Sequence, residues 1–354
     1  MQERILHGLL EKHYTPTAIC HSVPRQYDLI RAGITPRSIV SNAFAHLGVP
    51  PGVNPYDELA CEEIKWRRPQ ALFSVDVKDA FPSITDEHVF DIFERIIGDP
   101  MLALTLTRLC TWNGCLPQGA PTSSLLLNMV FEPVDAVLQQ EFGSFPFRVT
   151  RYVDDITVTS TRPAIKKRDR EKLVTFLADH GFRVNDEKTC YWLRWRHVLR
   201  VTGLNIFSRL SRPPEAAEEC KAPFPIGLAY MPGCIVLPPR AVDQFRALLH
   251  GLTLELRSLN IGIRGCLEEA REDAGEDFAS EIMSLRKQRK RPFYRILGIL
   301  AFCTMVYGDQ IPGRIYSGCR ELKESNGFFV ELIEFIKARS FSEIYEAAEI
   351  ASGY

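Results

Sequence analysis

The alternation of apolar and polar residues is clearest in two segments, and it predicts that both are strands of a sheet. Residues 71–77, ALFSVDV, alternate with period two and contain the Val and Phe that are typical of half-buried strands. The segment FPSIT then interrupts the pattern, and Thr85 is placed to cap a helix with the sequence DEHVFDIFERII. The first strand therefore delivers Asp76 to a strand-to-helix corner.

The second alternating segment is FRVTRYVDDITVTS at residues 147–160. Apolar and polar positions alternate before and after two adjacent acids, which predicts a hairpin with Asp154 and Asp155 at its tip. Further elements are predicted around it, with helices over 99–112, 125–138 and 163–180 and strands near 189–193 and 198–207. Because strands and helices do not alternate regularly, the pattern favours an α+β fold.

Both ends of the chain are predicted to be helical. Residues 1–20 have an amphipathic pattern that ends near Pro16. Beyond RPPEAAEE, helical periodicity indicates a separate helical subdomain that begins near 210–240, with candidate helices over 240–260, 263–285, 293–306 and 327–349.

The length and composition are those of a globular protein. With 354 residues, the chain is long enough for one mixed domain or two linked subdomains. Its 45% hydrophobic and 25% charged residues, with Gly and Pro spread without a period, exclude collagen-like, mucin-like and solenoid proteins. The formal net charge is −1, so binding to nucleic acid must come from local basic patches rather than from the field of the whole molecule.

Cysteine spacing and hydropathy indicate the cellular compartment in which the protein is expected. The 10 cysteines form no C-x-x-C pair, which speaks against zinc ribbons and disulfide frameworks and favours reduced thiols. The longest apolar run, at 296–307, is too short to span a bilayer, and the first residues lack a long apolar segment. We therefore expect a cytoplasmic protein with no membrane partner.

Asp76, Asp154 and Asp155 are the candidate chemical centre. Two adjacent acids at a turn can be a solvated loop, because Asp favours turns. An open sheet could also bring the end of the first strand next to the hairpin tip, so that three carboxylates converge. Such oxygen ligands, with no His or Cys clustered nearby, suit Mg²⁺ or Mn²⁺, and two ions about 4 Å apart can support phosphoryl transfer.

Five blocks of the sequence resemble the motifs of reverse transcriptases, in the family order. SVDVKDAFPSIT at 74–85 is similar to the motif with the first catalytic aspartate, and LPQGAPTSS at 116–124 to the nucleotide-pocket motif. RYVDD at 151–155 resembles the Y-x-D-D catalytic hairpin, and GFRVNDEKT at 181–189 and VTGLNI at 201–206 follow. Within that family, SNAFAH and VTG resemble two elements of the bacterial retron-type enzymes.

The resemblance implies a right-hand polymerase fold. Truncated fingers are expected at 1–70, an antiparallel-sheet palm carrying the YVDD hairpin at 71–210, and a helical thumb and C-terminal region at 211–354. The chain begins about where the first fingers helix of the family lies, so the preceding basic strands are expected to be missing. A second subunit or an effector protein could supply them.

The resemblance also implies roles for single residues. Asp76 and Asp154 are expected to bind both metal ions, with the Val77 main-chain carbonyl as a further ligand and Asp155 assisting. Three more positions are expected to contact the nucleotide or its leaving group. Gln118 and Gly119 would line the incoming nucleotide, and Phe81 would pack under its sugar, unless that ring is a core residue. Lys188 would protonate pyrophosphate or neutralise its charge, unless it is an exposed lysine of a turn.

Several residues are candidates for contact with nucleic acid. Asn42 and His46 are expected to order the fingers or to contact RNA, and a buried, fully bonded histidine is an equal alternative. Basic runs next to aromatic residues suit phosphate contacts and base stacking, although a run can also be a solvated helix face. The residues chosen from these runs are Arg67, Arg68, Trp195, Arg289, Lys290 and Arg291.

The expected activity is RNA-directed DNA polymerisation. The enzyme would extend a primer on a structured non-coding RNA with deoxynucleoside triphosphates and two Mg²⁺ or Mn²⁺ ions, and release a DNA product. A retron-type enzyme would act in antiphage defence with an effector protein. The alternatives are a defence polymerase that makes repetitive or untemplated DNA, and an RNA-binding scaffold without polymerisation. The three intact aspartates argue against the scaffold.

Overall fold

A computed structural model describes residues 1–22, 37–47, 68–206, 235–272 and 276–307 of the chain. The described residues up to Ile206 belong to one compact unit, and those from Ile235 onward belong to a second. None of the described helices combines the length and the apolar character needed to cross a bilayer. The expected division into fingers, palm and thumb stays a prediction.

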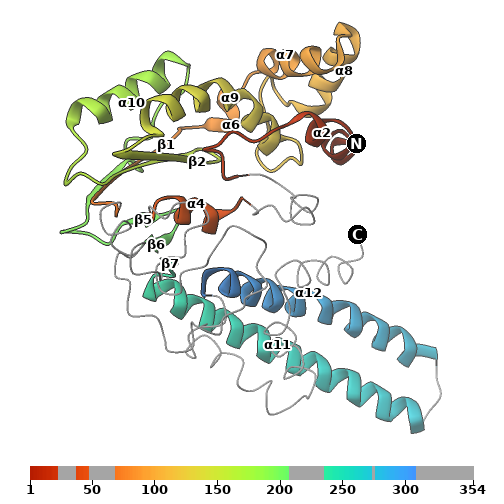
Figure 1. The fold of residues 1–354 in the computed structure, drawn as a ribbon. Helices are drawn as coiled ribbons and strands as arrows, with labels where there is room; N and C mark the ends of the chain where they lie inside the picture. The colour runs from red at the N-terminus through yellow and green to blue at the C-terminus, as the bar shows by residue number, and fades with distance from the viewer. Residues whose placement is uncertain (23–36, 48–67, 207–234, 273–275, 308–354) are drawn as a thin grey trace. The chain divides into compact units, whose positions relative to one another are not determined.

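The first unit is built around a four-stranded antiparallel sheet (Figure 1). Its strands are β1 (Ala71–Asp76), β2 (Phe147–Tyr152), β3 (Asp155–Ser160) and β4 (Cys190–Leu193), in the order β2-β3-β1-β4. β2 and β3 form a hairpin, and β1 pairs with β3 so that Asp76 lies opposite Asp155. The order explains how two segments far apart in sequence meet at one end of the sheet.

The two faces of this sheet differ in chemistry. Ala71, Phe73 and Val75 of β1 are buried in the hydrophobic core, as are Ile156 and Val158 of β3. The alternate positions of β3 are Asp155, Thr157 and Thr159, which face the other side because successive side chains of a strand alternate. In Figure 1, helices α9 (Ser123–Phe142) and α10 (Lys167–Asp179) lie over one face and α4 (Ile39–Ala45) over the other. The apolar face thus holds the core, and the polar face carries the acids.

Local sequence signals account for the helices after β1. The short helix α6 (Ala80–Ser83) is followed by α7 (Asp86–Ile97), which begins with a capping box between Thr85 and His88. The Asp99 carboxylate caps α8 (Pro100–Cys110) by accepting from the N–H groups of Met101 and Leu102. These starts agree with the helices predicted from residue 85 and over 99–112.

The N-terminal helical stretch is shorter than the sequence pattern predicts. It comprises α1 (Gln2–Ile5), the π-helical turn η1 (Leu6–Leu10) and α2 (Glu11–His13), and it therefore ends before Pro16. The chain then runs beside β2, where Arg151 N–H donates to the Ile19 carbonyl at 2.7 Å and His21 N–H donates to the Arg151 carbonyl at 2.8 Å. The helix therefore ends about one turn before the predicted position, and the pairing with β2 follows it.

The polar face of the sheet is anchored to α4 by one imidazole. His46 is fully buried, and its Nδ1 and Nε2 lie 2.8 Å from Thr159 Oγ1 and 2.7 Å from Thr150 Oγ1. The two threonines belong to β3 and β2, so one ring ties α4 to both strands of the hairpin. Burial lowers the pKa of His46 from its usual 6.5 to about 3, with smaller contributions from His21 and Arg148.

The single strand predicted near 198–207 is two short strands within the described residues, because a tight turn divides them. β5 (Arg200–Val201) and β6 (Leu204–Ile206) pair as an antiparallel hairpin. The turn between them contains Thr202 and Gly203, both with positive φ, at 43° and 81°. Cys20, Cys110, Cys115 and Cys190 carry free thiols.

The second unit contains the short strand β7 (Ile235–Val236) and the long helices α11 (Pro239–Glu272) and α12 (Glu276–Tyr307), which lie side by side in Figure 1. The predicted breaks near 261 and between 285 and 293 are wrong. Gly262 lies inside α11, and a Cβ there would be at an ordinary contact distance, 3.5 Å, from Leu285 Cδ1 of α12, so the glycine does not end the helix. The predicted helix at 327–349 lies outside the described residues.

A buried ion pair joins α9 to the hairpin. Arg151 of β2 and Asp135 of α9 are both fully buried, and the carboxylate accepts two hydrogen bonds of 2.7 Å, from Arg151 Nε and Nη2. Thr17 Oγ1 donates a further bond of 2.7 Å to the same carboxylate. The Phe131 ring packs against the guanidinium, 4.6 Å from its Cζ. Removing either charge would leave the other buried and unpaired.

The ion pair generates a stability prediction. Asp135→Ala is expected to lower the free energy of unfolding by about 3–5 kcal/mol, because Arg151 then keeps an uncompensated buried charge. Urea denaturation followed by circular dichroism measures the change. The double variant Asp135→Leu with Arg151→Met is expected to recover most of the loss. A single variant as stable as the parent would contradict the prediction.

His46 generates a pH prediction. Since its pKa is lower in the folded protein than in the unfolded chain, the unfolded chain binds the proton first, and stability is lost as pH falls below 6.5 toward 3. His46→Gln can still bond both threonines but has no titrating ring. Between about pH 6.5 and 4.5, its free energy of unfolding is expected to fall by about 2 kcal/mol less than that of the parent. The control His197→Gln, at an exposed position, should keep the parent's pH dependence in urea titrations. An equal loss of stability in the parent and in His46→Gln would refute the role of His46 in the pH dependence.

Candidate active site

Three aspartates meet where β1 ends and β3 begins. Asp76 is the last residue of β1 and pairs in register with Asp155, the first residue of β3. Asp154 precedes it in the turn, and its carbonyl accepts a hydrogen bond of 2.9 Å from Val77 N–H. The structure therefore brings together the three carboxylates that the sequence singles out.

The turn before Asp154 is held in an unfavourable conformation. Val153 has φ at 57°, in the left-handed region that a β-branched residue rarely adopts. Both its main-chain groups have buried partners, since the Val153 carbonyl accepts from Arg151 Nη1 at 2.9 Å and its N–H donates to Ser22 Oγ at 2.8 Å. Asn128 of α9 connects the two, because its Oδ1 accepts from Arg151 Nη1 at 2.9 Å and from Ser22 Oγ at 3.2 Å. These bonds position the residue that leads into Asp154.

The carboxylates of the site are partly buried and lie close to one another, which raises the pKa values of two of them. Burial raises the pKa of Asp154, and the charge of Asp76 raises it further. Burial likewise raises the pKa of Asp155, with additional contributions from Asp154 and Asp76, although Ser74 Oγ donates a 2.6 Å hydrogen bond to Asp155 that opposes the shift. A cation placed among these groups would favour the charged carboxylates and oppose the rise in their pKa.

Lys188 lies beside the first carboxylate. Its Nζ is 3.1 Å from Asp76 Oδ1 and 3.2 Å from Oδ2, and its side chain is 62% exposed. The hydrogen bond to Asp76 and the charge of Asp76 raise the pKa of Lys188. The turn that carries it is fixed to the end of β1, because Asn185 N–H donates to the Asp76 carbonyl at 2.8 Å. The predicted lysine therefore lies at the edge of the carboxylate site, while its chemical role stays a prediction.

The donor set fits magnesium or manganese. All the side-chain donors are carboxylate oxygens, the ligands that these hard cations prefer. Among the residues that the structure describes, no group of three or more His, Cys, Asp or Glu side chains is arranged so that it could hold a metal ion without further ligands. Mg²⁺ commonly takes one or two carboxylates and completes its shell with water and substrate phosphate, so an open set of ligands suits it.

The residues predicted for the nucleotide come from adjoining segments. Phe81, in α6, is partly buried and packs against the hydrophobic core. Gln118 and Gly119 are exposed, and Gly119 has φ at 82°. The loop before them is tied to the end of α6 by the 3.1 Å hydrogen bond from Leu116 N–H to the Ile84 carbonyl. The structure thus supports a shared location, and nucleotide contact stays a prediction.

Asn42 and His46 lie inside the protein. Neither side chain is exposed. His46 bonds the hairpin threonines, and Asn42 Nδ2 donates to Thr202 Oγ1, in the β5–β6 turn, at 3.4 Å. This environment fits the alternative in which both residues order the structure, and their contact with RNA stays a prediction.

The other candidates for nucleic-acid contact fall in both units. Arg68 is half-buried and Trp195 is 69% exposed in the first unit. Lys290 and Arg291 are exposed on α12 of the second. Arg67 and the side chain of Arg289 lie outside the part of the chain that is described. Contact with nucleic acid stays a prediction for all six.

Sequence reasoning missed the residues that support the hairpin. Ser22, Asn128, Asp135 and Arg151 make the buried polar contacts around its tip, and Ser74 bonds Asp155. One signal was present, because Asn128, Glu132 and Asp135 interrupt the mostly apolar sequence of the predicted helix at 125–138. A polar residue within such a run needs a buried partner.

Comparison with known proteins finds similarity over the part of the chain that contains the three aspartates. Residues 30–218, more than half of the chain, match the family described as reverse transcriptase (RNA-dependent DNA polymerase). The retron Ec86 reverse transcriptase of Escherichia coli is 31% identical over 172 residues, which cover 48% of this chain and 47% of that protein. The retron Mx65 reverse transcriptase of Myxococcus xanthus is 28% identical over 171 residues, covering 43% and 40%. The chain spans less than half the length of these curated relatives.

Solved structures give a weaker likeness. Telomerase from Candida albicans, in complex with a TWJ fragment of telomeric RNA, is 12% identical with a TM-score of 0.39, over 96% of this chain and 57% of that one. The family match and the retron relatives confirm the resemblance seen in the motifs. The aspartates at 76, 154 and 155 all fall within the matched residues, and the chain belongs to the reverse transcriptase family.

Proposed function

We propose that this protein is an RNA-directed DNA polymerase that extends a primer on an RNA template with deoxynucleoside triphosphates. The observation that carries the proposal is the meeting of Asp76, Asp154 and Asp155 at one end of the sheet, within a chain of the reverse transcriptase family. The template is a structured non-coding RNA and the product is DNA. The proposal includes a role in antiphage defence with an effector protein or second subunit, as the resemblance to retron-type enzymes implies.

The finer architecture belongs to the same proposal. The sheet with the YVDD hairpin is the palm, over residues 71–210, with shortened fingers at 1–70 and a helical thumb from 211 to 354. The long helices α11 and α12 suit a thumb, because a helical pair offers a face along which a primer–template duplex can lie.

The carboxylates hold the reacting groups in place. Asp76 and Asp154 would each bind two divalent cations, with the Val77 carbonyl as a further ligand and Asp155 assisting. When bound, such ions lower the pKa of the attacking hydroxyl and stabilise the leaving pyrophosphate. The Ser74 hydrogen bond orients Asp155, and the bonds at Val153 orient Asp154, so the protein fixes the ligands before substrate arrives.

Lys188 is placed to handle the charge of the leaving group. Its ammonium already lies against Asp76 and its side chain is 62% exposed, so it can turn toward pyrophosphate on the solvent side. There it donates a proton or neutralises charge. Gln118 and Gly119 line the incoming nucleotide, and Phe81 packs against its sugar.

The metal assignment generates a prediction of activity. Asp154→Asn is expected to abolish nucleotide addition, because it removes the negative charge of a ligand that both ions share. The fold and RNA binding are expected to persist. Primer extension with Mg²⁺ measures activity, and circular dichroism checks the fold. The matched control Asp91→Asn changes an exposed aspartate of α7 and should extend primers like the parent. Full extension by Asp154→Asn would remove this residue from the metal site.

The position of Phe81 generates a prediction of sugar selectivity. A ring in the space of a 2′-hydroxyl rejects ribonucleotides by a clash and by leaving that hydroxyl unpaired, worth about 2–4 kcal/mol, or roughly 30- to 1,000-fold. Phe81→Ala is therefore expected to raise ribonucleotide use relative to deoxynucleotide use. Phe81→Tyr keeps the ring and should keep the discrimination. Single-nucleotide addition with matched dNTP and rNTP gives the ratio, and an unchanged ratio in a folded, active Phe81→Ala variant excludes the contact.

A further inference from the structure

Three segments meet at the end of the sheet where β1 begins. Gln70 joins them, because its N–H donates to the Ser160 carbonyl at 2.7 Å and its carbonyl accepts from Arg194 N–H at 2.8 Å. The segments that precede β1, follow β3 and follow β4 therefore lie side by side. A six-residue strand is roughly 17–20 Å long, so this end is about that far from Asp76 at the other end of β1.

Basic residues gather there from all three segments. We call them the basic end: Arg68, Arg162, Lys166, Lys167, Arg194 and Arg196. Within the described residues, Lys167 has a carboxylate partner, Glu171 at 3.4 Å, and the other five have none within 4 Å. Burial lowers the pKa of Arg194, and the charge of Arg68 lowers it further. The Arg68 and Arg194 charges therefore act on each other with no carboxylate within 4 Å among the described residues, which favours an anionic ligand.

Aromatic rings alternate with these charges. Trp195 is 69% exposed, and the Arg196 guanidinium stacks on it with Cζ 4.2 Å from the ring centroid. Tyr191 of β4 accepts a hydrogen bond of 3.1 Å from Ile165 N–H, which fixes the segment that leads into α10. The Arg170 guanidinium lies 4.1 Å from the Tyr191 ring. Stacked arginine and tryptophan beside uncompensated charge are typical of surfaces that bind single-stranded nucleic acid.

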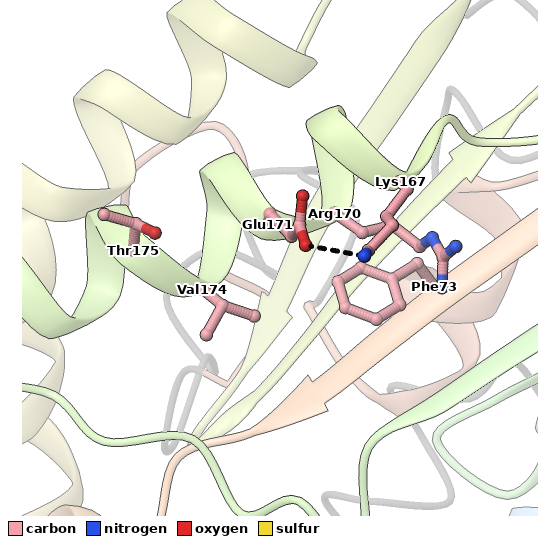
Figure 2. A pocket seen from close by; sticks show the side chains of 6 residues that line it. All are labelled: Phe73, Lys167, Arg170, Glu171, Val174 and Thr175. Carbon is pink, nitrogen blue, oxygen red and sulfur yellow. Dashed lines mark ion pairs between the residues drawn. The ribbon is translucent and has the colours of Figure 1, made fainter.

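A pocket borders the basic end. Its volume is about 300 Å³, and it is lined by Phe73, Lys167, Arg170, Glu171, Val174 and Thr175. Figure 2 shows the two basic side chains beside the Phe73 ring, with Thr175 at the opposite end. Arg170 Nε is buried and has no hydrogen-bond partner among the described residues. A planar group that accepts a hydrogen bond, such as a nucleobase, would satisfy that nitrogen and fill the space.

We propose that the basic end binds the phosphate backbone of a single-stranded RNA loop, with one unstacked base in the bordering pocket. The choice of RNA as the partner rests on the proposed function, while the location rests on charge, aromatic exposure and the unsatisfied Arg170 nitrogen. The primer–template would occupy the carboxylate end of the sheet. The basic end would therefore hold a different part of the RNA and retain the template while its copied end moves through the site.

The test measures RNA binding with the catalytic end occupied. The full chain is saturated with an unlabelled primer–template without divalent metal, and a fluorescein-labelled RNA hairpin with a single-stranded loop is titrated at several KCl concentrations. The triple variant Arg162→Ala, Lys166→Ala, Arg196→Ala is expected to bind the hairpin at least tenfold more weakly. Its log–log salt slope should be flatter by about two, since each phosphate contact to a single strand contributes roughly 0.7.

A matched triple variant controls for net charge. Arg4→Ala, Lys12→Ala and Arg108→Ala remove three exposed charges from helices α1, α2 and α8, and hairpin binding should equal that of the parent. Both triple variants should extend a short primer–template at the parental rate. An unchanged salt slope in the first variant, or an equal loss in the control, overturns the proposal. Binding to phosphatidylserine vesicles but not to the hairpin overturns RNA as the partner.

Primer extension separates this proposal from the proposed function. A parent that binds the hairpin at the basic end but extends no primer would overturn the polymerase activity and leave the RNA surface standing. The pocket has its own variant, Thr175→Trp, which fills it. We expect this change to weaken binding of the looped hairpin severalfold and to leave a blunt RNA duplex unaffected. Equal effects on both RNAs, or none, overturn the placement of a base in the pocket.

Discussion

The buried pair of Arg151 and Asp135 is the interaction on which the site depends. A single guanidinium takes both oxygens of the Asp135 carboxylate and also the Val153 carbonyl at the hairpin tip. Desolvating two charges is expensive, and apolar residues of similar volume often stabilise a protein equally well. An apolar side chain could not bond the Val153 carbonyl, however. We therefore interpret the pair as an interaction that fixes the left-handed turn ahead of Asp154, although it costs some stability.

The alternation of the strands separates this supporting network from the chemistry. Arg151 faces the core beneath α9, whereas Thr150, Thr157 and Thr159 face α4 together with Asp155. The hairpin is therefore clamped from both faces, by an ion pair on one and by the His46 imidazole on the other. Because the clamps act on the same two strands, a small shift of α4 or α9 would be felt at the carboxylates. This explains why the buried polar residues of this unit concentrate around the hairpin rather than being spread through the core.

Periodicity and the family motifs predicted the strand that ends at Asp76, the hairpin at 147–160 and the acids that meet there, because period two and turn residues are local signals. The partners of those elements are not local. Nothing near His46 in the sequence indicates Thr150 and Thr159, and Asn128 reaches Ser22 across more than one hundred residues. The helix break predicted near 261 failed for a related reason. The local pattern breaks near 261, whereas α11 continues to Glu272 and packs against α12, with Leu285 of α12 within contact distance of Gly262.

The sheet also separates charge along its length. With a formal net charge of −1, the protein exerts no general attraction on a polyanion, so local segregation is the way for it to bind one. The acids collect where β1 ends, and arginines with no carboxylate partner among the described residues follow the segments that meet where β1 begins. The Debye length is about 8 Å at physiological salt, which is less than half the length of the strand. Salt therefore screens most of the electrostatic interaction between the two groups. Each end therefore keeps its own potential, one suited to divalent cations and the other to phosphate, and a single rigid strand sets the distance between them.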